Sequence, residues 1–460
     1  MPEHAPSSRS RLERAVDLGL VLLLVGVGLG SYDRAVRGRY DFHHFYRDAR
    51  YVWEHRALNP EVLAFAAEEH ARQLPFYLPV VPVILAPLAG FGRLVDGPES
   101  AAPRAAALVW AALQVAALGY ALRVLRRWST PAEGPVAAGV QADRPTVFAV
   151  AVILTLPAIF EAVRFNQLSF FVLALVLGSV DRLARGRDVS GGMLLALAAV
   201  LKLLPAIFLP WLLLTRRWRA AGAFAVTGLL IAFVPPAVVF GPAQALAYHA
   251  EWWSRNAGGR AAGPGGGLLE MAAPDHFIDH RNQSIVQVLA RWTWPEHRFP
   301  APWQPVALSA SAVQVLALGV MVVLALVLLW VTASKRTQSI AAGRAEAAVY
   351  AIGMLVFSPL LRQYYLVWTL PALLLLVGLA AQPRGVRGRG LGVIGVAVWV
   401  AGMALWTWPA ARLLGVHLAM LLILGGLLLA ARGRGQSVRA EQEEAGAVAE
   451  AARREPGRSA

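Results

Sequence analysis

Long apolar segments recur along the whole chain, and they limit the possible folds more than any other feature. The twelve segments lie at residues 15–32, 77–95, 103–124, 145–162, 168–182, 190–214, 220–241, 306–333, 346–361, 363–381, 391–408 and 412–430. A helix needs about 20 apolar residues to cross the core of a bilayer. Of the 460 residues, 57% are hydrophobic and only 15% are charged, too few charges to cover a soluble domain of this size. We therefore expect an all-α polytopic membrane protein.

The chain carries a formal net charge of +15, and most of its arginines stand in short clusters beside the apolar segments. The basic clusters lie at residues 9–11, 123–127, 182–187, 216–217, 335–336, 384–389 and 432–434. Such clusters are typical of cytoplasmic anchors that contact anionic lipid headgroups. No basic stripe interleaved with aromatic residues lies outside the apolar segments, so we expect membrane lipids and no nucleic acid as partners.

The absence of cysteine from the chain limits its chemistry. Disulfides, iron–sulfur clusters, thiolate zinc sites and cysteine nucleophiles are excluded. Cysteine usage therefore gives no indication of the cellular compartment.

Two long polar connections, residues 33–76 and 242–304, divide the apolar segments into groups. The first apolar segment has a basic flank and no small-residue cleavage site, which predicts an uncleaved span with its N-terminus inside the cell. Both polar connections then lie outside. The expected order is a cytoplasmic N-terminus (1–14), a membrane module (15–241) that includes outer loop 33–76, a second outer loop (242–304), C-terminal transmembrane helices (305–431) and a flexible cytoplasmic tail (432–460).

Two numbers of membrane crossings, twelve and ten, fit the sequence. Twelve single crossings place the clusters at 123–127 and 182–187 outside, against the tendency of basic residues to stay inside. Re-entrant helices at 77–95 and 190–214 reduce the number to ten and place both clusters inside. Both segments contain prolines, which remove backbone hydrogen bonds and favour broken helices. The two polar connections lie outside in either case.

A polar and aromatic stretch follows the first apolar segment and begins at Asp41. Its apolar periodicity predicts an amphipathic helix at the membrane surface, with Asp41 at the N-cap position. A carboxylate at this outer mouth could act as a general base that takes a proton from an acceptor hydroxyl, and a plain helix cap fits the sequence equally well. Asp33 and Asp48 are the competing carboxylates.

His43 and His44 lie in the same stretch and are possible contributors to a site. Adjacent residues splay apart around a helix, so the two rings are not expected to bind one ligand together.

Lys202 is one of only two lysines in the chain, and it interrupts a long apolar run. A lysine at such a depth is costly and by default indicates a functional partner such as a phosphate or a carboxylate. The alternative is a lysine that reaches the interface, or that donates to carbonyls freed by Pro205.

Three further polar stretches could contact a phosphate or a sugar. They are Asn166 and Gln167; Arg281, Asn282 and Gln283; and Arg362, Tyr364 and Tyr365. The first pair could instead cap the next helix. The planar fork of Arg362 suits a phosphate, and the two tyrosines also suit an interfacial belt.

A histidine pair in the second outer loop raises the question of a metal site. His276 and His280 are four residues apart, beside Asp275 and Asp279. The spacing implies no third ligand, so we expect no metal.

The order of these motifs resembles glycosyltransferase family 87, a group of the GT-C superfamily that includes polyprenyl-phosphate-mannose-dependent α-mannosyltransferases. The matching elements are Asp41-Phe42 through Tyr46 and Ala49, Tyr77-Leu78-Pro79 with Pro87-Leu88, Lys202-Leu203-Leu204-Pro205 with Arg216-Arg217-Trp218, Asn282-Gln283-Ser284 and Ser358-Pro359. Two elements depart from the family pattern. The glycine is missing before Phe165-Asn166-Gln167, and Arg362, Tyr364 and Tyr365 replace the usual Trp and His. The resemblance covers residues 15 to 380.

The resemblance implies a GT-C bundle with seven spans before the second outer loop, which favours twelve crossings. It also implies transfer of a hexose, with mannose the first candidate, from a polyprenyl-phosphate donor to a lipid or glycan acceptor outside the plasma membrane. Asp41 would be the base of an inverting displacement. Lys202, Arg281 and Arg362 would hold the leaving phosphate, with Asn282, Gln283, Tyr364 and Tyr365 around the phosphate and the sugar. No metal or other cofactor is expected.

Two other function classes remain open at this point. A secondary transporter also uses broken helices at the middle of the membrane, but it is expected to have internal repeats, and none is found. A polymerase or ligase of lipid-linked glycans would share the substrates and would depend on the Arg and His residues of a large outer loop.

Overall fold

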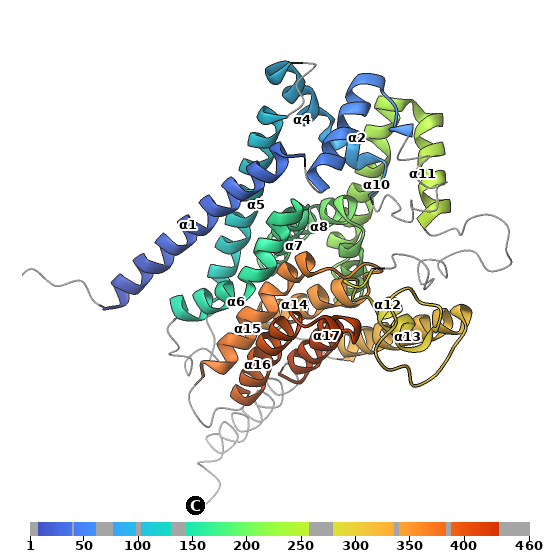
Figure 1. Cartoon of the computed structure of the whole chain (residues 1–460). Coiled ribbons are helices and arrows are strands. Elements are labelled where there is room, and N and C mark those ends of the chain that lie inside the picture. Colours follow the sequence, from blue (N-terminus) through green and yellow to red (C-terminus); the bar gives the residue numbers. More distant parts are fainter. Residues whose placement is uncertain are drawn as a thin grey trace, which may run out of the picture.

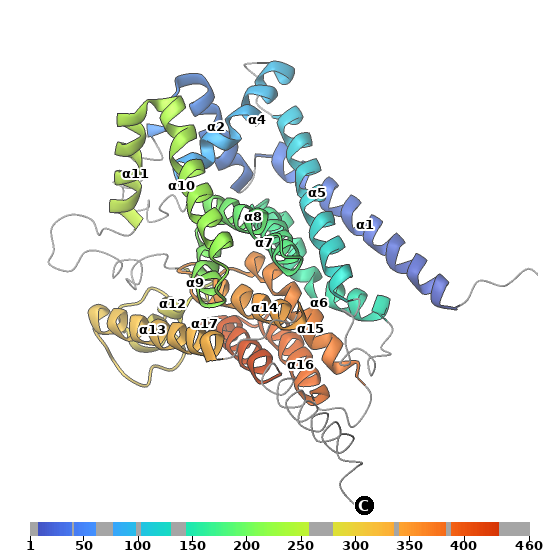
Figure 2. The same cartoon turned by 180° about the vertical axis from the view of Figure 1, so that it is seen from behind.

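The structure, a computed structural model, describes residues 8–38, 41–60, 77–97, 103–129, 144–256, 279–334, 340–382 and 388–431. Every regular element in these ranges is a helix, as expected (Figures 1 and 2). The labelled helices are α1 (Ser8–Val36), α2 (Asp41–His55), α4 (Val80–Asp96), α5 (Arg104–Trp128), α6 (Arg144–Phe165), α7 (Ser169–Ala184), α8 (Asp188–Leu201), η1 (Leu204–Ile207), α9 (Phe208–Leu214), α10 (Trp218–Phe240), α11 (Pro242–Asn256), α12 (Ile285–Thr293), α13 (Ala310–Ser334), α14 (Ile340–Val356), η3 (Gln363–Thr369), α15 (Leu370–Ala380), α16 (Arg389–Leu405) and α17 (Pro409–Leu413). Another apolar helix covers Val416–Ala431. The predicted cytoplasmic tail lies outside the described residues.

Six helices in the described ranges are long and apolar enough to cross a membrane. They cover Arg11–Val36, Arg104–Trp128, Pro145–Phe165, Trp218–Phe240, Ala310–Ala333 and Gln363–Ala380. Large apolar side chains face outward on these helices, such as Leu29 on α1 (67% exposed) and Trp330 on α13 (70% exposed). Lipid, unlike water, is a good solvent for such surfaces. The chain is therefore a polytopic α-helical membrane protein.

One end of the helical bundle is held together by two residues of the arginine clusters and by Arg344. Arg126 on α5 pairs with Asp17 on α1, and Arg217 pairs with Asp188 on α8 at 2.8 Å. Arg344 on α14 donates to a backbone carbonyl at the end of α5. The starts of α1 and α14 therefore meet the end of α5 here. The end of α7 joins the starts of α8 and α10 to it, because Asp181 lies 3.8 Å from Arg127 and Arg217 donates to the Leu183 carbonyl (2.8 Å). We name Asp17, Arg126, Asp188, Arg217 and Arg344 the basic end.

The amphipathic helix expected after the first span is confirmed as α2, at the opposite end of α1. Its buried face consists of Phe42, Phe45, Ala49 and Val52. The helix packs against α4, where Gly90 leaves room for the Trp53 ring. A Cβ atom at position 90 would lie 2.5 Å from that ring, so the glycine allows the two helices to approach closely.

Two segments return to the end of the bundle at which they started. α8 begins at Asp188 in the basic end, the helix breaks at Lys202, and η1 and α9 lead back to Arg217 in the same end. α4 ends at Asp96, whose carboxylate accepts a hydrogen bond from the Ala105 N–H at the start of α5 (2.8 Å). These are the segments for which the ten-crossing alternative expects re-entrant helices.

The break at Lys202 is held in place by the packing of α8 on α10. Both views show the two helices side by side in the middle of the molecule (Figures 1 and 2). A Cβ atom at Gly192 of α8 would lie 2.1 Å from the Ala220 carbonyl oxygen of α10, so the backbones touch at this point. This contact anchors the helix whose end carries Lys202.

Candidate active site

The first half of the site is the break that follows α8. Pro205 has no N–H, and in a continuous helix its ring would clash with the carbonyl of Leu201. The helix therefore ends at Leu201, and Lys202 takes an extended conformation (φ −155°, ψ 123°). The lysine side chain is almost completely buried, with 7% of its surface exposed.

The second half of the site is a break between α14 and α15. Arg362 has an extended backbone (φ −115°, ψ 157°), and the 3₁₀-helix η3 follows it. This tighter helix buries three aromatic side chains that point to the site, Tyr364, Tyr365 and Trp368. The interfacial belt considered for the two tyrosines is therefore not what the structure shows.

Lys202 lies inside a cage of aromatic rings, two from the second break and one, Tyr77, from the segment before α4. Its Nζ donates a hydrogen bond to the Tyr365 hydroxyl and lies 3.7 Å from the centroid of the same ring. The rings of Tyr77 and Trp368 are each 5.8 Å away. Ring faces attract a cation, and the attraction is stronger where water is excluded. Lys202 is thus held within the protein and does not reach out to the interface.

Asp41 is electrostatically coupled to this cage. Burial raises the pKa of Asp41 to about 6, while the positive charges of Lys202 and Arg362 act in the opposite direction. Phe45, one turn after Asp41, packs on the Tyr77 ring of the cage (4.9 Å between centroids), so the start of α2 lies beside the cage. At neutral pH Asp41 is mostly ionised, yet it is more basic than an ordinary carboxylate.

Gln167 contacts the aromatic cage, whereas its neighbour Asn166 stabilises the turn that carries Gln167. The Tyr77 hydroxyl donates to Gln167 Oε1 (3.2 Å). Asn166 is fully buried, accepts a hydrogen bond from Trp110 Nε1 (2.9 Å) and donates one to the Ser31 carbonyl (3.0 Å). Its backbone is left-handed (φ 54°), a conformation that asparagine tolerates well. Asn166 therefore fixes the turn between α6 and α7 that presents Gln167.

Asn282 and Gln283 also have partners within the protein, and both are fully buried. Asn282 Oδ1 accepts from the backbone N–H of Leu361 (3.0 Å), and its Nδ2 donates to the Pro359 carbonyl (3.1 Å). Gln283 Nε2 donates to the Arg412 carbonyl (2.7 Å). Asn282 thus attaches the segment before α12 to the one that carries Arg362, and Gln283 attaches it to α17.

The side chain of Arg362 and the backbone N–H of Arg281 bind the two oxygens of one carboxylate, while the Arg281 side chain donates from Nε to His280 Nε2 (3.3 Å). Arg362 forms an ion pair with Asp279 at 2.7 Å. The other oxygen of Asp279 accepts from the Arg281 backbone N–H (2.7 Å) and lies 3.4 Å from His280 Nδ1. His276, the other half of the histidine pair, lies outside the described residues.

The other candidates on α1 and α2 lie apart from the cage. The side chains of His43 and His44 are exposed, with their rings 6.0 Å apart. Asp33 pairs with Arg37 (2.7 Å), and Asp48 accepts a hydrogen bond from Asn59 (3.3 Å). Asp41 therefore remains the candidate base of this site.

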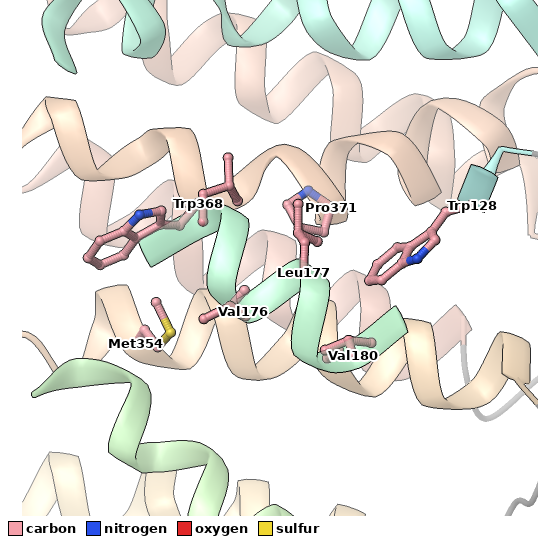
Figure 3. A pocket seen from close by; sticks show the side chains of 10 residues that line it. Trp128, Val176, Leu177, Val180, Met354, Trp368 and Pro371 are labelled. Atoms are coloured by element: carbon pink, nitrogen blue, oxygen red, sulfur yellow. The ribbon is translucent and has the colours of Figure 1, made fainter. Parts of the chain in front are cut away.

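Trp368 is a site residue that the sequence analysis missed. It stacks on Tyr365 (5.1 Å between centroids, 15° between planes) and donates to the Ser169 carbonyl (2.9 Å). Its other neighbours line an apolar pocket between α7, α14 and α15 that extends to Trp128 (Figure 3). Trp368 follows Tyr365 by three residues, a spacing that places both side chains on one face of a 3₁₀-helix. A tryptophan in an apolar run is, however, usually assigned to the core.

Comparison with known proteins decides the class of this site. The profile of glycosyltransferase family 87 matches residues 76–359, more than half of the chain. The chain belongs to glycosyltransferase family 87. It is therefore a membrane hexosyltransferase, and the transporter alternative is set aside. The match includes Lys202, whereas Asp41 and Arg362 lie outside it and are assigned from their contacts.

A curated relative extends the comparison over most of the chain. It is the polyprenol-phosphate-mannose-dependent alpha-(1-2)-phosphatidylinositol mannoside mannosyltransferase of Mycobacterium tuberculosis (strain ATCC 25618 / H37Rv). The two sequences are 29% identical over 406 residues, which cover 85% of this chain and 83% of the relative. No solved structure matches the chain.

The support given by Asn166 can be tested by two substitutions. Asn166→Gly keeps the left-handed backbone but loses both side-chain hydrogen bonds. Asn166→Ala loses the hydrogen bonds and also strains the backbone. We expect Asn166→Gly to lower the free energy of unfolding by about 1–3 kcal/mol, because the buried Trp110 N–H loses its acceptor. Asn166→Ala should cost about 1 kcal/mol more. Unfolding in detergent measures both, and equal losses would show that the backbone conformation is irrelevant.

Proposed function

We propose that this glycosyltransferase moves mannose from a polyprenyl-phosphate donor to a lipid or glycan acceptor on the extracytoplasmic side of the plasma membrane, with Asp41 as the general base. The observation that carries the proposal is the coupling of Asp41 to Lys202 and Arg362, which come from two separate helix breaks. The donor named for the mycobacterial relative supports the choice of a polyprenyl-phosphate sugar.

In the proposed reaction, Asp41 accepts the proton of an acceptor hydroxyl. The hydroxyl oxygen attacks the anomeric carbon of the sugar, and the bond between this carbon and the phosphate oxygen breaks. The lipid phosphate leaves with the bonding electrons. Because the displacement occurs in one step from the opposite face, the configuration at the anomeric carbon is inverted.

Negative charge grows on the leaving phosphate, and the site has cations to stabilise it. Lys202 provides a point charge fixed by Tyr365, and Arg362 provides a planar fork. The Nε atom of Arg362 is buried and has no hydrogen-bond partner among the described residues. In the proposal this N–H donates to a phosphate oxygen.

The proposal includes a topology of ten crossings. The segments α4 and α8–α9 are treated as re-entrant, because each returns to the end at which it started. The basic end then lies in the cytoplasm, in agreement with the usual placement of arginine clusters. Lys202 is at the tip of a re-entrant hairpin that approaches from the cytoplasmic side, and Asp41 meets it from the outer side.

The role of Asp41 predicts the effect of one conservative substitution. Asp41→Asn keeps the size and the capping ability of the side chain but cannot accept the proton. We expect turnover to fall by roughly 10²–10⁴ at normal expression. The assay is transfer of radiolabelled mannose from polyprenyl-phosphate mannose, with products followed by lipid extraction. The matched control is Asp48→Asn on the same helix, which should keep near-normal turnover. Normal transfer by Asp41→Asn would remove this residue as the base.

The raised pKa of Asp41 predicts an acid limb in the pH profile. Because the protonated acid cannot act as a base, kcat/KM of the wild type should fall about tenfold per pH unit below about 6. Lys202→Met removes a positive charge that lowers the pKa of Asp41. The acid limb of the pH profile of this variant should therefore move to higher pH. Arg50→Gln, on an arginine that pairs with Glu54 at 2.7 Å, is the control and should leave the limb in place. An unshifted limb in Lys202→Met would show that the two groups are not coupled.

A further inference from the structure

The ion pair between Arg362 and Asp279 leaves part of the arginine unused. Nη2 of Arg362 lies 2.7 Å from Oδ2 of Asp279, and the two side chains are 17% and 29% exposed. The Nε atom of the same guanidinium is buried and has no hydrogen-bond partner among the described residues. A buried donor without a partner is costly, so this N–H indicates a group that arrives with a substrate.

The carboxylate of Asp279 is itself held by the turn that follows it. Its Oδ1 accepts a hydrogen bond from the Arg281 backbone N–H (2.7 Å). The backbone carbonyl of Asp279 accepts from the Asn282 N–H (2.9 Å) and from Nη1 of the buried Arg291 (3.4 Å). These contacts limit the freedom of the carboxylate, so it can act as a fixed point for Arg362.

The segment that carries Arg362 is attached to the same turn. The Leu361 carbonyl accepts from the Gln283 N–H (2.9 Å), and the Leu361 N–H donates to Asn282 Oδ1 (3.0 Å). Both ends of the ion pair are therefore held relative to each other by hydrogen bonds between their segments. Because the guanidinium is planar and rigid, holding its stem and its Nη2 also fixes the direction of its Nε–H.

The negative charge of Asp279 is compensated at both of its oxygens. The Nε of Arg281 donates to His280 Nε2 (3.3 Å), so the proton of the neutral imidazole is on Nδ1. That Nδ1 lies 3.4 Å from Oδ1 of Asp279, while Arg362 binds Oδ2. Donors at both oxygens weaken the repulsion between this carboxylate and a phosphate bound to Arg362.

We propose that Asp279 is a positioning residue of the transfer reaction, which binds Nη2 of Arg362 and thereby directs the Nε–H of the same guanidinium to the donor phosphate. The inference rests on the proposed function for the presence of that phosphate, and it adds the residue that aligns Arg362. Asp279 does not touch the substrate in this arrangement. Its effect reaches the donor through Arg362 alone.

A double-mutant cycle tests this dependence. Asp279→Asn keeps an acceptor for the Arg281 N–H but removes the charge that holds Arg362. We expect the KM for polyprenyl-phosphate mannose to rise by roughly 5–30-fold, with the KM for the acceptor unchanged. In an Arg362→Gln background the same change should have no further effect on the donor KM, because no guanidinium is left to align. Equal rises in both backgrounds would show a purely structural role and overturn the inference.

A lysine at position 362 separates alignment from charge. Arg362→Lys can pair with Asp279, but a single ammonium cannot hold the carboxylate and also present a second, fixed donor to the phosphate. We expect its donor KM to rise about as much as that of Asp279→Asn. Adding Asp279→Asn to this variant should release the ammonium and lower the donor KM again, by about threefold. A further rise in the double variant would contradict the proposed alignment.

Two more variants control for folding. Asp279→Glu keeps the carboxylate and replaces Asp279→Asn if the latter does not fold. It moves the carboxylate by one methylene, so the donor KM should rise by about threefold, and an unchanged donor KM would overturn the inference. Asp17→Asn breaks an ion pair with Arg126 at the basic end and should change neither KM.

A binding measurement distinguishes failure of this inference from failure of the proposed function. The probe is farnesyl phosphate, which carries a phosphate on a short polyprenyl chain, and the full-length enzyme is placed in phosphatidylcholine nanodiscs. Binding that weakens by roughly 5–30-fold in Asp279→Asn would support the alignment of Arg362 even if no mannose were transferred. Binding that weakens in Arg362→Gln but not in Asp279→Asn would overturn the inference and leave the proposed function intact.

Discussion

The buried charge of Lys202 and its contact with Tyr365 determine how the rest of the site is arranged. A lysine at this depth costs several kcal/mol unless it is paired and hydrogen-bonded. The hydroxyl and the ring of Tyr365 stabilise it from the protein side, and Asp41 supplies the opposite charge. Two interrupted helices and the start of α2 must therefore meet at one point. The close packing of α8 on α10 at Gly192 and the turn held by Asn166 keep them there.

The same arrangement suits the proposed binding of a phosphate between two cations. Lys202 cannot move far, because three aromatic rings surround it. Arg362 is already held by its ion pair with Asp279. In the proposed reaction the phosphate meets groups that the protein already holds in place, and such preorganisation lowers the cost of reorganisation in the transition state.

Much of the fold could be predicted from the sequence, because local patterns determine it. The apolar segments, the amphipathic helix that begins at Asp41 and the break at Pro205 each depend on residues close to one another in the chain. The pairing of Lys202 with Tyr365 spans 163 residues, and no local pattern contains it. The roles of Asn166, Asn282 and Gln283 could also not be predicted from the sequence. Polar side chains beside a site can face either a ligand or the backbone, and only their partners show which.

The central claim is that the donor phosphate lies between Lys202 and Arg362 with Asp41 on the opposite face of the sugar. The most direct measurement is an electron cryomicroscopy structure of the enzyme in a nanodisc with a non-hydrolysable polyprenyl-phosphate mannose analogue. We expect phosphate oxygens within about 3 Å of Lys202 Nζ and of the Arg362 guanidinium, at the distance of a charge-assisted hydrogen bond. The anomeric carbon should face the Asp41 carboxylate. A phosphate bound away from both cations, or a sugar that does not face Asp41, would contradict the account.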